Sequence, residues 1–260
     1  MENIILEKDV IEGLREIDNN SVDIIIADPP YNIGKDFGNE SDKQEMNEYI
    51  NWCEVWIKEC ERILKTSGTL YIYGFSEILA FLRTKVSINV RWLIWHYTNK
   101  NVPSLNFWQR SHESILCCYK NKKQVVFNRD DVREPYTETF LKNAAGKTRK
   151  ATKGRYGETE TTYNAHSEGA LPRDVIKVTA LAGGAGKKER VNHPTQKPLE
   201  LCEKLLKSSM NKEGETNVVV PFAGSGSECV AAKKLGCNFL AFEINPEYIV
   251  IANNRLAEII

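Results

Sequence analysis

The amino-acid sequence predicts an α/β protein with a doubly wound, mostly parallel sheet and an inserted region in the middle of the chain. Residues 22–27 form an apolar, β-branched run that is too short for a helix and is typical of a strand buried on both faces of a sheet. Residues 217–242 read as strand, glycine turn, helix and strand. Strands that alternate with helices in this way favour a parallel sheet.

The segment Asp28-Pro29-Pro30-Tyr31 follows the first buried strand. Proline cannot donate to a sheet ladder, so we expect the strand to stop at Asp28 and its tip to be stiff. Ligands of open α/β sheets bind beyond the carboxyl ends of strands, and the tip would place a carboxylate and a phenol in such a cleft. Alone, the segment more often just ends a strand, with Asp28 as a cap.

A second segment, Pro221-Phe222-Ala223-Gly224-Ser225-Gly226, follows a strand near the end of the chain. Its Gly-x-Gly turn lets the backbone approach a ligand closely, and Glu243, at the end of the next strand, suits a ribose diol. Cys229 stands where the dinucleotide fingerprint has its third glycine. This disfavours a nicotinamide cofactor and leaves an adenosyl ligand without a pyrophosphate open. Alone, the segment is equally consistent with a structural turn.

The other elements follow from apolar periodicity and caps. Asp9 is a suitable N-cap, Pro246 suits a first helical turn, and Ser67-Gly68 is expected to end a helix. The expected strands are 3–7, 69–73, 91–97 and 113–119, and the expected helices are 10–17, 46–64, 77–84, 199–210 and 246–260. The polar stretch 32–44 is placed to be a mobile loop over the site.

The composition is that of an ordinary globular protein. The formal net charge of the 260 residues is zero, and 42% of them are hydrophobic. The sequence contains no 18-residue apolar run, no signal peptide and no Cys-x-x-Cys among its seven cysteines. We therefore expect a cytoplasmic protein with no membrane partner, no disulfide framework and no metal site.

The middle of the chain is basic. Residues 120–191 carry 16 Lys or Arg and 9 Asp or Glu, so their net charge is +7 and that of the remainder is −7. Such a stretch suits phosphate contacts with DNA, although a solvated loop region would show the same balance. The candidates in its most basic run, expected to be a loop, are Lys142, Lys147, Arg149, Lys150, Lys153 and Arg155.

Together the two segments resemble the DNA amino-methyltransferases that use S-adenosylmethionine (SAM). The order, with Asp-Pro-Pro-Tyr before Phe-x-Gly-x-Gly, is similar to the beta class, and His193-Pro194-Thr195-Gln196-Lys197-Pro198 resembles the segment before its cofactor strand. The resemblance covers roughly residues 1–120 and 191–260. It implies a circularly permuted class I SAM-dependent methyltransferase fold, with a catalytic half at 1–120, a target-recognition region at 121–191 and a SAM-binding half at 192–260.

The resemblance also implies roles. Asp28 and the Pro29 carbonyl would accept the amino N–H groups of a flipped base, and Tyr31 would offer a ring for stacking. Phe107 or Trp108 could also stack on the base, although packing of this pair under its loop is slightly favoured, and Arg110 is a further DNA contact. The implied catalytic residues are Asp28, Pro29, Pro30 and Tyr31. The implied SAM contacts are Asp9, Val10, Asp28, His193, Thr195, Lys197, Pro221, Phe222, Ala223, Gly224, Ser225, Gly226, Glu243, Ile244 and Asn245, with Thr195 and Lys197 at the methionine carboxylate.

Two features leave alternatives open. Many relatives carry an acid where Val220 precedes Pro221, so a catalytically weak DNA-binding partner subunit is one alternative. Within the class, an aspartate at position 28 is more usual for adenine-N6 enzymes and a serine for cytosine-N4 enzymes, which favours adenine. Methylation of protein glutamine or RNA is disfavoured, because those relatives have the two segments in reverse order. Besides DNA, the resemblance allows a homodimer and a cognate restriction endonuclease as partners.

Overall fold

The computed structural model describes residues 3–35, 37, 42–99, 104–149, 161–162 and 164–259. The chain forms two compact units. The larger comprises residues 1–127 and 174–260, and the smaller comprises residues 128–173. No helix among the described residues is long and apolar enough to cross a membrane.

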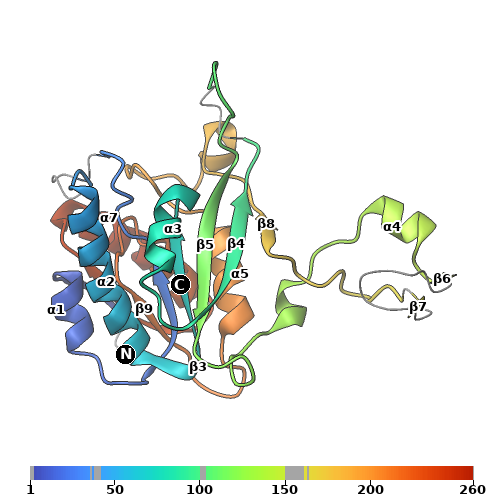
Figure 1. Cartoon of the computed structure of the whole chain (residues 1–260), viewed down its shortest axis with the longest axis horizontal. Helices are drawn as coiled ribbons and strands as arrows, with labels where there is room; N and C mark the ends of the chain where they lie inside the picture. The colour runs from blue at the N-terminus through green and yellow to red at the C-terminus, as the bar shows by residue number, and fades with distance from the viewer. Residues whose placement is uncertain are drawn as a thin grey trace. The chain divides into compact units, whose positions relative to one another are not determined.

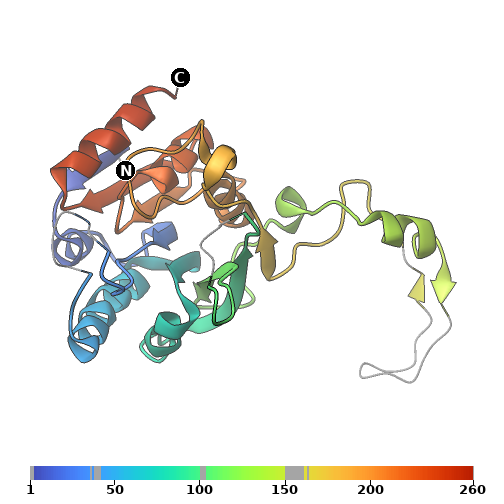
Figure 2. The same ribbon diagram turned by 90° about the horizontal axis from the view of Figure 1, so that it is seen from above.

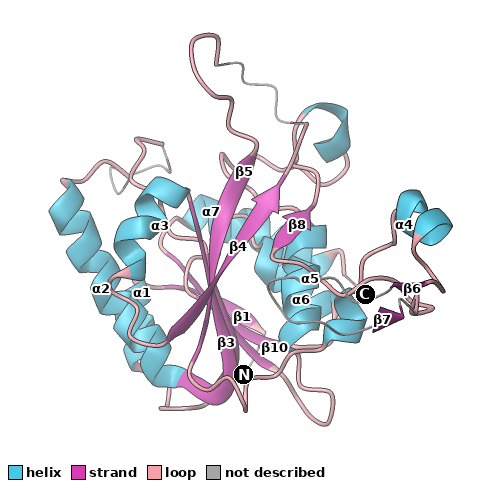
Figure 3. Ribbon diagram, turned by 45° about the vertical axis from the view of Figure 1, so that its right-hand side comes forward, coloured by secondary structure: helices cyan, strands magenta, loops and turns pink. Residues whose placement is uncertain are grey.

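The larger unit is built on an eight-stranded sheet (Figures 1 and 3). Its strands, in spatial order, are β1 (Ile4–Glu7), β10 (Asn238–Glu243), β9 (Asn217–Val220), β2 (Val22–Ala27), β3 (Leu64–Gly74), β5 (His112–Tyr119), β4 (Asn89–His96) and β8 (Val175–Lys177). Only β5 runs antiparallel to its neighbours; the other pairs are parallel. The predicted mostly parallel α/β sheet is therefore confirmed.

Helices cover both faces of this sheet (Figure 2). Helices α1 (Val10–Arg15), α2 (Met46–Ile63) and α3 (Ser76–Arg83) pack on one face, and α5 (Leu199–Ser209), α6 (Ser227–Lys234) and α7 (Pro246–Ala257) on the other. Strand β2 contributes to both cores, because Ile24 and Ile26 point to one and Ile25 and Ala27 to the other. This alternation explains why its sequence is apolar without interruption.

The role predicted for Ser67-Gly68 is wrong. Helix α2 ends at Ile63, one residue from its expected end, and β3 begins at the next residue instead of at Thr69. Gly68 lies within β3 rather than at a helix cap, where a Cβ atom would stand 2.7 Å from the carbonyl oxygen of Asp23. The glycine therefore serves a close approach between two strands, which has the same local sequence signal as a cap.

The smaller unit has little regular structure. It contains a 3₁₀ turn at Arg129–Val132, helix α4 (Glu138–Asn143), and the short strands β6 (Thr148–Arg149) and β7 (Thr161–Thr162). Lys142 thus lies in a helix rather than in the expected loop. Arg133 ties the unit together, since it pairs with Asp130 at 2.8 Å and donates to the Gly169 carbonyl at 2.8 Å. A further 3₁₀ turn, Gly183–Gly186, belongs to the larger unit.

Candidate active site

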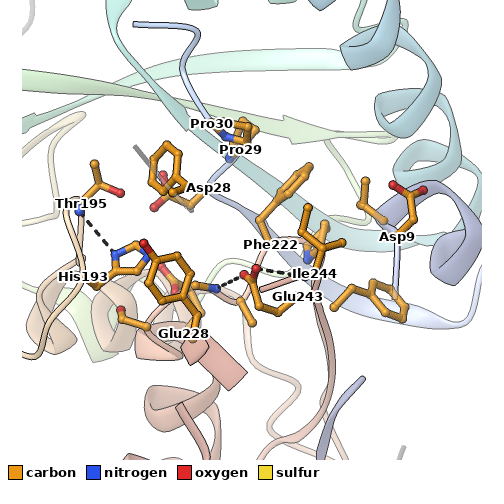
Figure 4. A pocket seen from close by; sticks show the side chains of 18 of the residues that line it. Asp9, Asp28, Pro29, Pro30, His193, Thr195, Phe222, Glu228, Glu243 and Ile244 are labelled. Atoms are coloured by element: carbon orange, nitrogen blue, oxygen red, sulfur yellow. Dashed lines mark hydrogen bonds between the residues drawn. The ribbon is translucent and has the colours of Figure 1, made fainter. Parts of the chain in front are cut away.

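The candidate site lies where β2 and β9 end. These strands pair in parallel, with Ile24 opposite Val218, so their carboxyl ends meet at one edge of the sheet. Beyond this edge lies a pocket lined by both apolar and polar side chains, as is typical of small-molecule sites. Residues 28–30 and 221–225, from the two segments singled out in the sequence, both line it (Figure 4).

Most of the predicted site residues share this pocket. Those that line it are Asp9, Val10, Asp28, Pro29, Pro30, His193, Thr195, Lys197, Pro221, Phe222, Ala223, Gly224, Ser225, Glu243 and Ile244. Tyr31, Gly226 and Asn245 do not line it. Each instead holds a neighbouring element, as described below.

Asp28 is held by a buried ion pair. Lys197 donates to its Oδ1 at 2.8 Å and its Oδ2 at 2.7 Å, and the Tyr31 hydroxyl donates to Oδ1 at 2.8 Å. The Lys197 side chain is 3% exposed and also lies 3.7 Å from Glu113. Burial alone would lower the pKa of Lys197, but the charges of Asp28 and Glu113 outweigh it and raise the pKa above its usual value. The lysine therefore stays charged.

The proline tip is fixed from behind. Tyr49, on α2, donates its hydroxyl to the Pro30 carbonyl at 2.7 Å. Tyr31 is buried, and its ring meets the edge of Phe75 with centroids 5.2 Å apart. Since the Tyr31 ring is buried and does not line the pocket, it positions Asp28 and is not presented as a free stacking surface.

The glycine turn after β9 is shaped by two left-handed residues. Gly224 has φ +49°, and a Cβ atom there would stand 2.9 Å from His193 Nε2. Gly226 has φ +75° and packs against Ala252 of α7. The Glu243 carboxylate accepts the backbone N–H of Gly224 at 2.8 Å, and also those of Ile244 and Asn245, the two residues that follow Glu243. An acid at the end of β10 thus closes the turn that follows β9.

The other end of the pocket is apolar. Phe222 packs against two indole rings of α2, with its centroid 5.8 Å from that of Trp52 and 5.4 Å from that of Trp56. Asp9 also lines the pocket, but its Oδ1 caps α1 by accepting the N–H of Ile11 at 2.8 Å and of Glu12 at 3.3 Å. The predicted capping role of Asp9 is confirmed.

His193 forms part of the pocket wall. Its ring meets that of Tyr248 with centroids 4.5 Å apart, and its Nδ1 accepts the N–H of Thr195 at 3.3 Å. Burial lowers the pKa of His193 to about 4, although the charge of Asp28 opposes this effect. The imidazole is therefore neutral at physiological pH and leaves Lys197 as the cation next to Asp28.

The loop after the proline tip is closed by its own hydrogen bonds. Asn32 and Gln44 exchange side-chain to backbone hydrogen bonds of 3.0 and 2.7 Å, and the buried Asp42 accepts backbone N–H groups from both Ile33 and Lys35. Phe37 lines the pocket, and its carbonyl accepts a hydrogen bond of 2.8 Å from Asn245. The described part of the loop, expected at 32–44 to cover the site, therefore contributes to the pocket.

The loop between β4 and β5 presents aromatic side chains to solvent. Phe107 and Trp108 are 80% and 87% exposed, so these two rings do not pack under the loop. Arg110 pairs with Glu77 at 2.9 Å and lies 4.1 Å above the ring of Phe75. Through Phe75, this arginine is linked to Tyr31 of the proline tip.

In the smaller unit, Lys142 and Lys147 are exposed. The Arg149 side chain and Lys150, Lys153 and Arg155 lie outside what the structure describes, so their assignment to DNA contacts stays a prediction. The unit also has a hollow that sequence reasoning missed, lined by Arg129, Arg133, Tyr136, Asn164, His166, Ala170, Leu171, Pro172 and Arg173. Its arginines are spread over more than forty residues and so form no run in the sequence.

Sequence reasoning also missed several residues of the main pocket. Glu228 lines it from the first turn of α6, and Trp52 lines it from α2. The others are Lys8, Phe37, Phe242 and Tyr248. Glu113 was read only as part of a strand, whereas it lies against Lys197 and Tyr31. Among the described residues, no group of three or more His, Cys, Asp or Glu is arranged to hold a metal ion.

A family model described as DNA methylase, for N6 and N4 enzymes, matches residues 22–254. The chain is 30% identical over 261 residues to the Type II methyltransferase M.HpaI of Haemophilus parainfluenzae, covering 98% of this chain and 74% of that protein. It is 32% identical over 256 residues to the DNA adenine methyltransferase YhdJ of Escherichia coli, covering 97% and 82%.

Solved structures show the same fold. The chain matches the cytosine-N4-specific PvuII DNA methyltransferase with a TM-score of 0.69 at 15% identity, over 96% of this chain and 85% of that one. It matches M1.HpyAVI, solved as a complex with SAM, with a TM-score of 0.63 at 22% identity, over 97% and 98%.

Proposed function

The chain belongs to the N6/N4 family of DNA methylases, and from this premise we propose that it transfers a methyl group from SAM to the N6 amino group of adenine at specific sites in DNA. The observation that carries the proposal is that the Asp28-Pro29-Pro30 tip and the Gly224 turn line one pocket. The tip offers acceptors for an amino group, and the turn offers close backbone approach to a cofactor.

The residues of the pocket fit SAM. Glu243, at the end of β10, suits the ribose hydroxyls, and the Trp52–Phe222 end suits the adenine ring. The wall at Gly224 has no room for a Cβ atom, as expected where a ligand or side chain packs on backbone. Bound there, SAM would supply an electrophilic methyl group on its sulfonium.

Asp28 orients the amino group that is methylated. Within the described part of the chain, its Oδ1 accepts two hydrogen bonds and its Oδ2 accepts one from Lys197, so Oδ2 keeps a lone pair for an amino N–H. The Pro29 carbonyl accepts the second N–H and turns the nitrogen lone pair toward the methyl group. These acceptors are held in place before the reaction, so they cost no reorganisation during transfer. After transfer, the extra proton leaves to water or to Asp28.

The ammonium of Lys197, a residue expected at the methionine carboxylate, lies 2.7 Å from Asp28. We propose that Lys197 acts first on the acceptor: it pairs with the Asp28 carboxylate and fixes its rotamer. Thr195, which lines the same wall, stays a candidate for the methionine carboxylate.

Two observations support adenine over cytosine. Position 28 carries an aspartate, which is more usual in the adenine-N6 enzymes of this class. The relative YhdJ, 32% identical over 97% of this chain, is a DNA adenine methyltransferase. The alternative, cytosine-N4 methylation, draws on the likeness to the PvuII enzyme, but at 15% identity that likeness concerns the fold.

The target base must leave the duplex to reach the pocket, which costs a few kcal/mol. We propose that Phe107 or Trp108, both exposed, stacks on the DNA near the flipped base, a contact worth about 1–3 kcal/mol per base. Phosphate contacts are assigned to Arg110 and the basic residues of the smaller unit, including Arg129 and Arg173 of its hollow.

The test is methyl transfer from radiolabelled SAM to unmethylated DNA, followed by hydrolysis and mass spectrometry of the nucleosides. We expect N6-methyladenine. N4-methylcytosine alone would overturn the choice of base, and no modified base, despite SAM binding, would favour the weak partner-subunit alternative. Sequencing methylated bases in host DNA with and without the protein would give the recognition site.

A further inference from the structure

We propose that Glu228 is the binding residue for the positively charged amino group of a ligand's amino-acid portion, the methionine end of SAM. The inference rests on the proposed function, because it assigns one end of the same pocket. It starts from a side chain that the family resemblance did not single out.

Glu228 is a buried acid without a cation. It is 3% exposed, belongs to the first turn of α6 and lines the pocket (Figure 4). The thiol of Cys202 donates to its Oε1 at 3.5 Å. In the described part of the chain, no Lys, Arg or His lies within ion-pair distance of Glu228. A buried carboxylate in this position either takes up a proton or binds a cation from outside.

Neighbouring charges show why the position favours a cationic ligand. The charge of Lys197 is already compensated by Asp28 and Glu113, and His193 is neutral. Lys8, at the pocket edge, pairs with Glu16 at 2.7 Å. Lys197 and Arg255 act on Glu228 only at longer range, so in the described part of the chain Glu228 is an acid without an ion-pair partner in this wall of the pocket.

The ionisation of Glu228 is finely balanced. Its pKa is raised to about 7, mainly by burial and also by the charge of Asp28, whereas the charge of Lys197 lowers it. A cation that enters the pocket would shift the carboxyl group fully to its charged form. The titratable groups that act on it or feel its charge are Asp28, Tyr73, Lys197, Cys202, Cys229 and Arg255.

The geometry of the sheet points to the amino-acid end of SAM. Glu243 ends β10 and Asp28 follows β2, on either side of β9, so these acids are about two strand spacings, or roughly 10 Å, apart. With ribose at Glu243 and the reacting methyl at Asp28, the amino-acid end continues past the glycine turn, where α6 begins. The end of β9 itself offers no charge there, because Val220 is apolar and buried.

The test measures, by calorimetry, the affinity of two ligands for the wild-type protein and for Glu228→Gln. S-adenosylhomocysteine carries the amino-acid portion, and 5′-methylthioadenosine lacks it. Charge-assisted hydrogen bonds are strong, so we expect Glu228→Gln to lower the affinity for S-adenosylhomocysteine about 10- to 100-fold. The affinity for 5′-methylthioadenosine should change less than about twofold. Glu203→Gln, at a half-buried position of α5 that does not line the pocket, controls for the loss of one negative charge.

The pH dependence gives an independent measurement without a variant. In the wild-type protein, affinity for S-adenosylhomocysteine should rise from pH 6 to pH 8 as Glu228 loses its proton, whereas affinity for 5′-methylthioadenosine should not. If Glu228→Gln lowers the affinity for both ligands equally, or for neither, the assignment is overturned. If the wild-type protein binds neither ligand, the proposed SAM site itself fails, a result distinct from failure of Glu228 alone.

Discussion

Replacing Lys197 by Met removes the cation that two carboxylates share. The Lys197 Nζ lies 2.7 Å from Asp28 and 3.7 Å from Glu113, whose side chains are 15% and 9% exposed. Breaking a buried pair by removing one partner costs about 3–5 kcal/mol, because the remaining charge is left in a poorly solvated site. For a chain of this size, that loss lowers the melting temperature by about 6–20 °C.

The sign of the pH dependence follows from the groups that titrate. The pKa of Lys197 is raised, so its contribution in the wild-type protein is complete below about pH 10 and constant from pH 5 to 9. In the variant, the carboxylates without a cation favour their protonated forms. The variant should therefore be least stable relative to wild type at pH 8, and this deficit should shrink toward pH 5.

Urea unfolding at several pH values measures both effects. Lys234→Met is the matched control, since Lys234 also lies 2.7 Å from a carboxylate, Glu203, but in an exposed pair that is worth about 0–1 kcal/mol. A loss in Lys197→Met no larger than in Lys234→Met at pH 8 would refute the reasoning. So would a deficit that grows toward acid pH.

Three further predictions concern ligand binding and transfer. Asp28→Asn should slow methyl transfer about 10²–10³-fold in single-turnover assays while SAM still binds; transfer at the wild-type rate would remove the proposed role of the carboxylate. Gly224→Ala should weaken SAM binding at least about tenfold, or about 1.4 kcal/mol, because the new Cβ atom would meet His193. The control is Gly236→Ala, where φ is also positive, at +71°, but the Cβ atom would meet open space, so the affinity for SAM should not change. Equal effects of the two variants would rule out the clash. Changing Lys147, Arg149, Lys150 and Lys153 together to Gln should flatten the salt dependence of DNA binding by about 0.9 in log–log slope for each lost phosphate contact. An unchanged slope would place the phosphates on another surface.

The sequence predicted those parts of the fold and site that depend on local composition. Strand β2 was readable because both of its faces are buried, and the turn at Gly224 because its backbone excludes side chains. The start of β3 was misread because Gly68, at a close strand contact, resembles a helix cap. The ion pair of Asp28 could not be predicted for a different reason: Lys197 is 169 positions away, and only the packing around Tyr31 and Glu113 decides which group its ammonium meets.

Val220 was the only sequence feature that favoured a partner subunit without turnover, and the structure weakens this argument. Pro221, the residue after Val220 at the end of β9, and Glu228, in the first turn of α6, line the same cavity. A carboxylate can therefore reach that cavity from either element, and in this chain Glu228 does so from the helix. The absence of an acid at position 220 thus removes a charge from the strand but not from the pocket, and it gives no reason to expect an inactive protein. If Glu228→Gln lowers the affinity for S-adenosylhomocysteine, adding Val220→Asp to that variant should restore part of this affinity. The reason is that Val220→Asp would supply a carboxylate from the end of β9 in place of the one lost from α6.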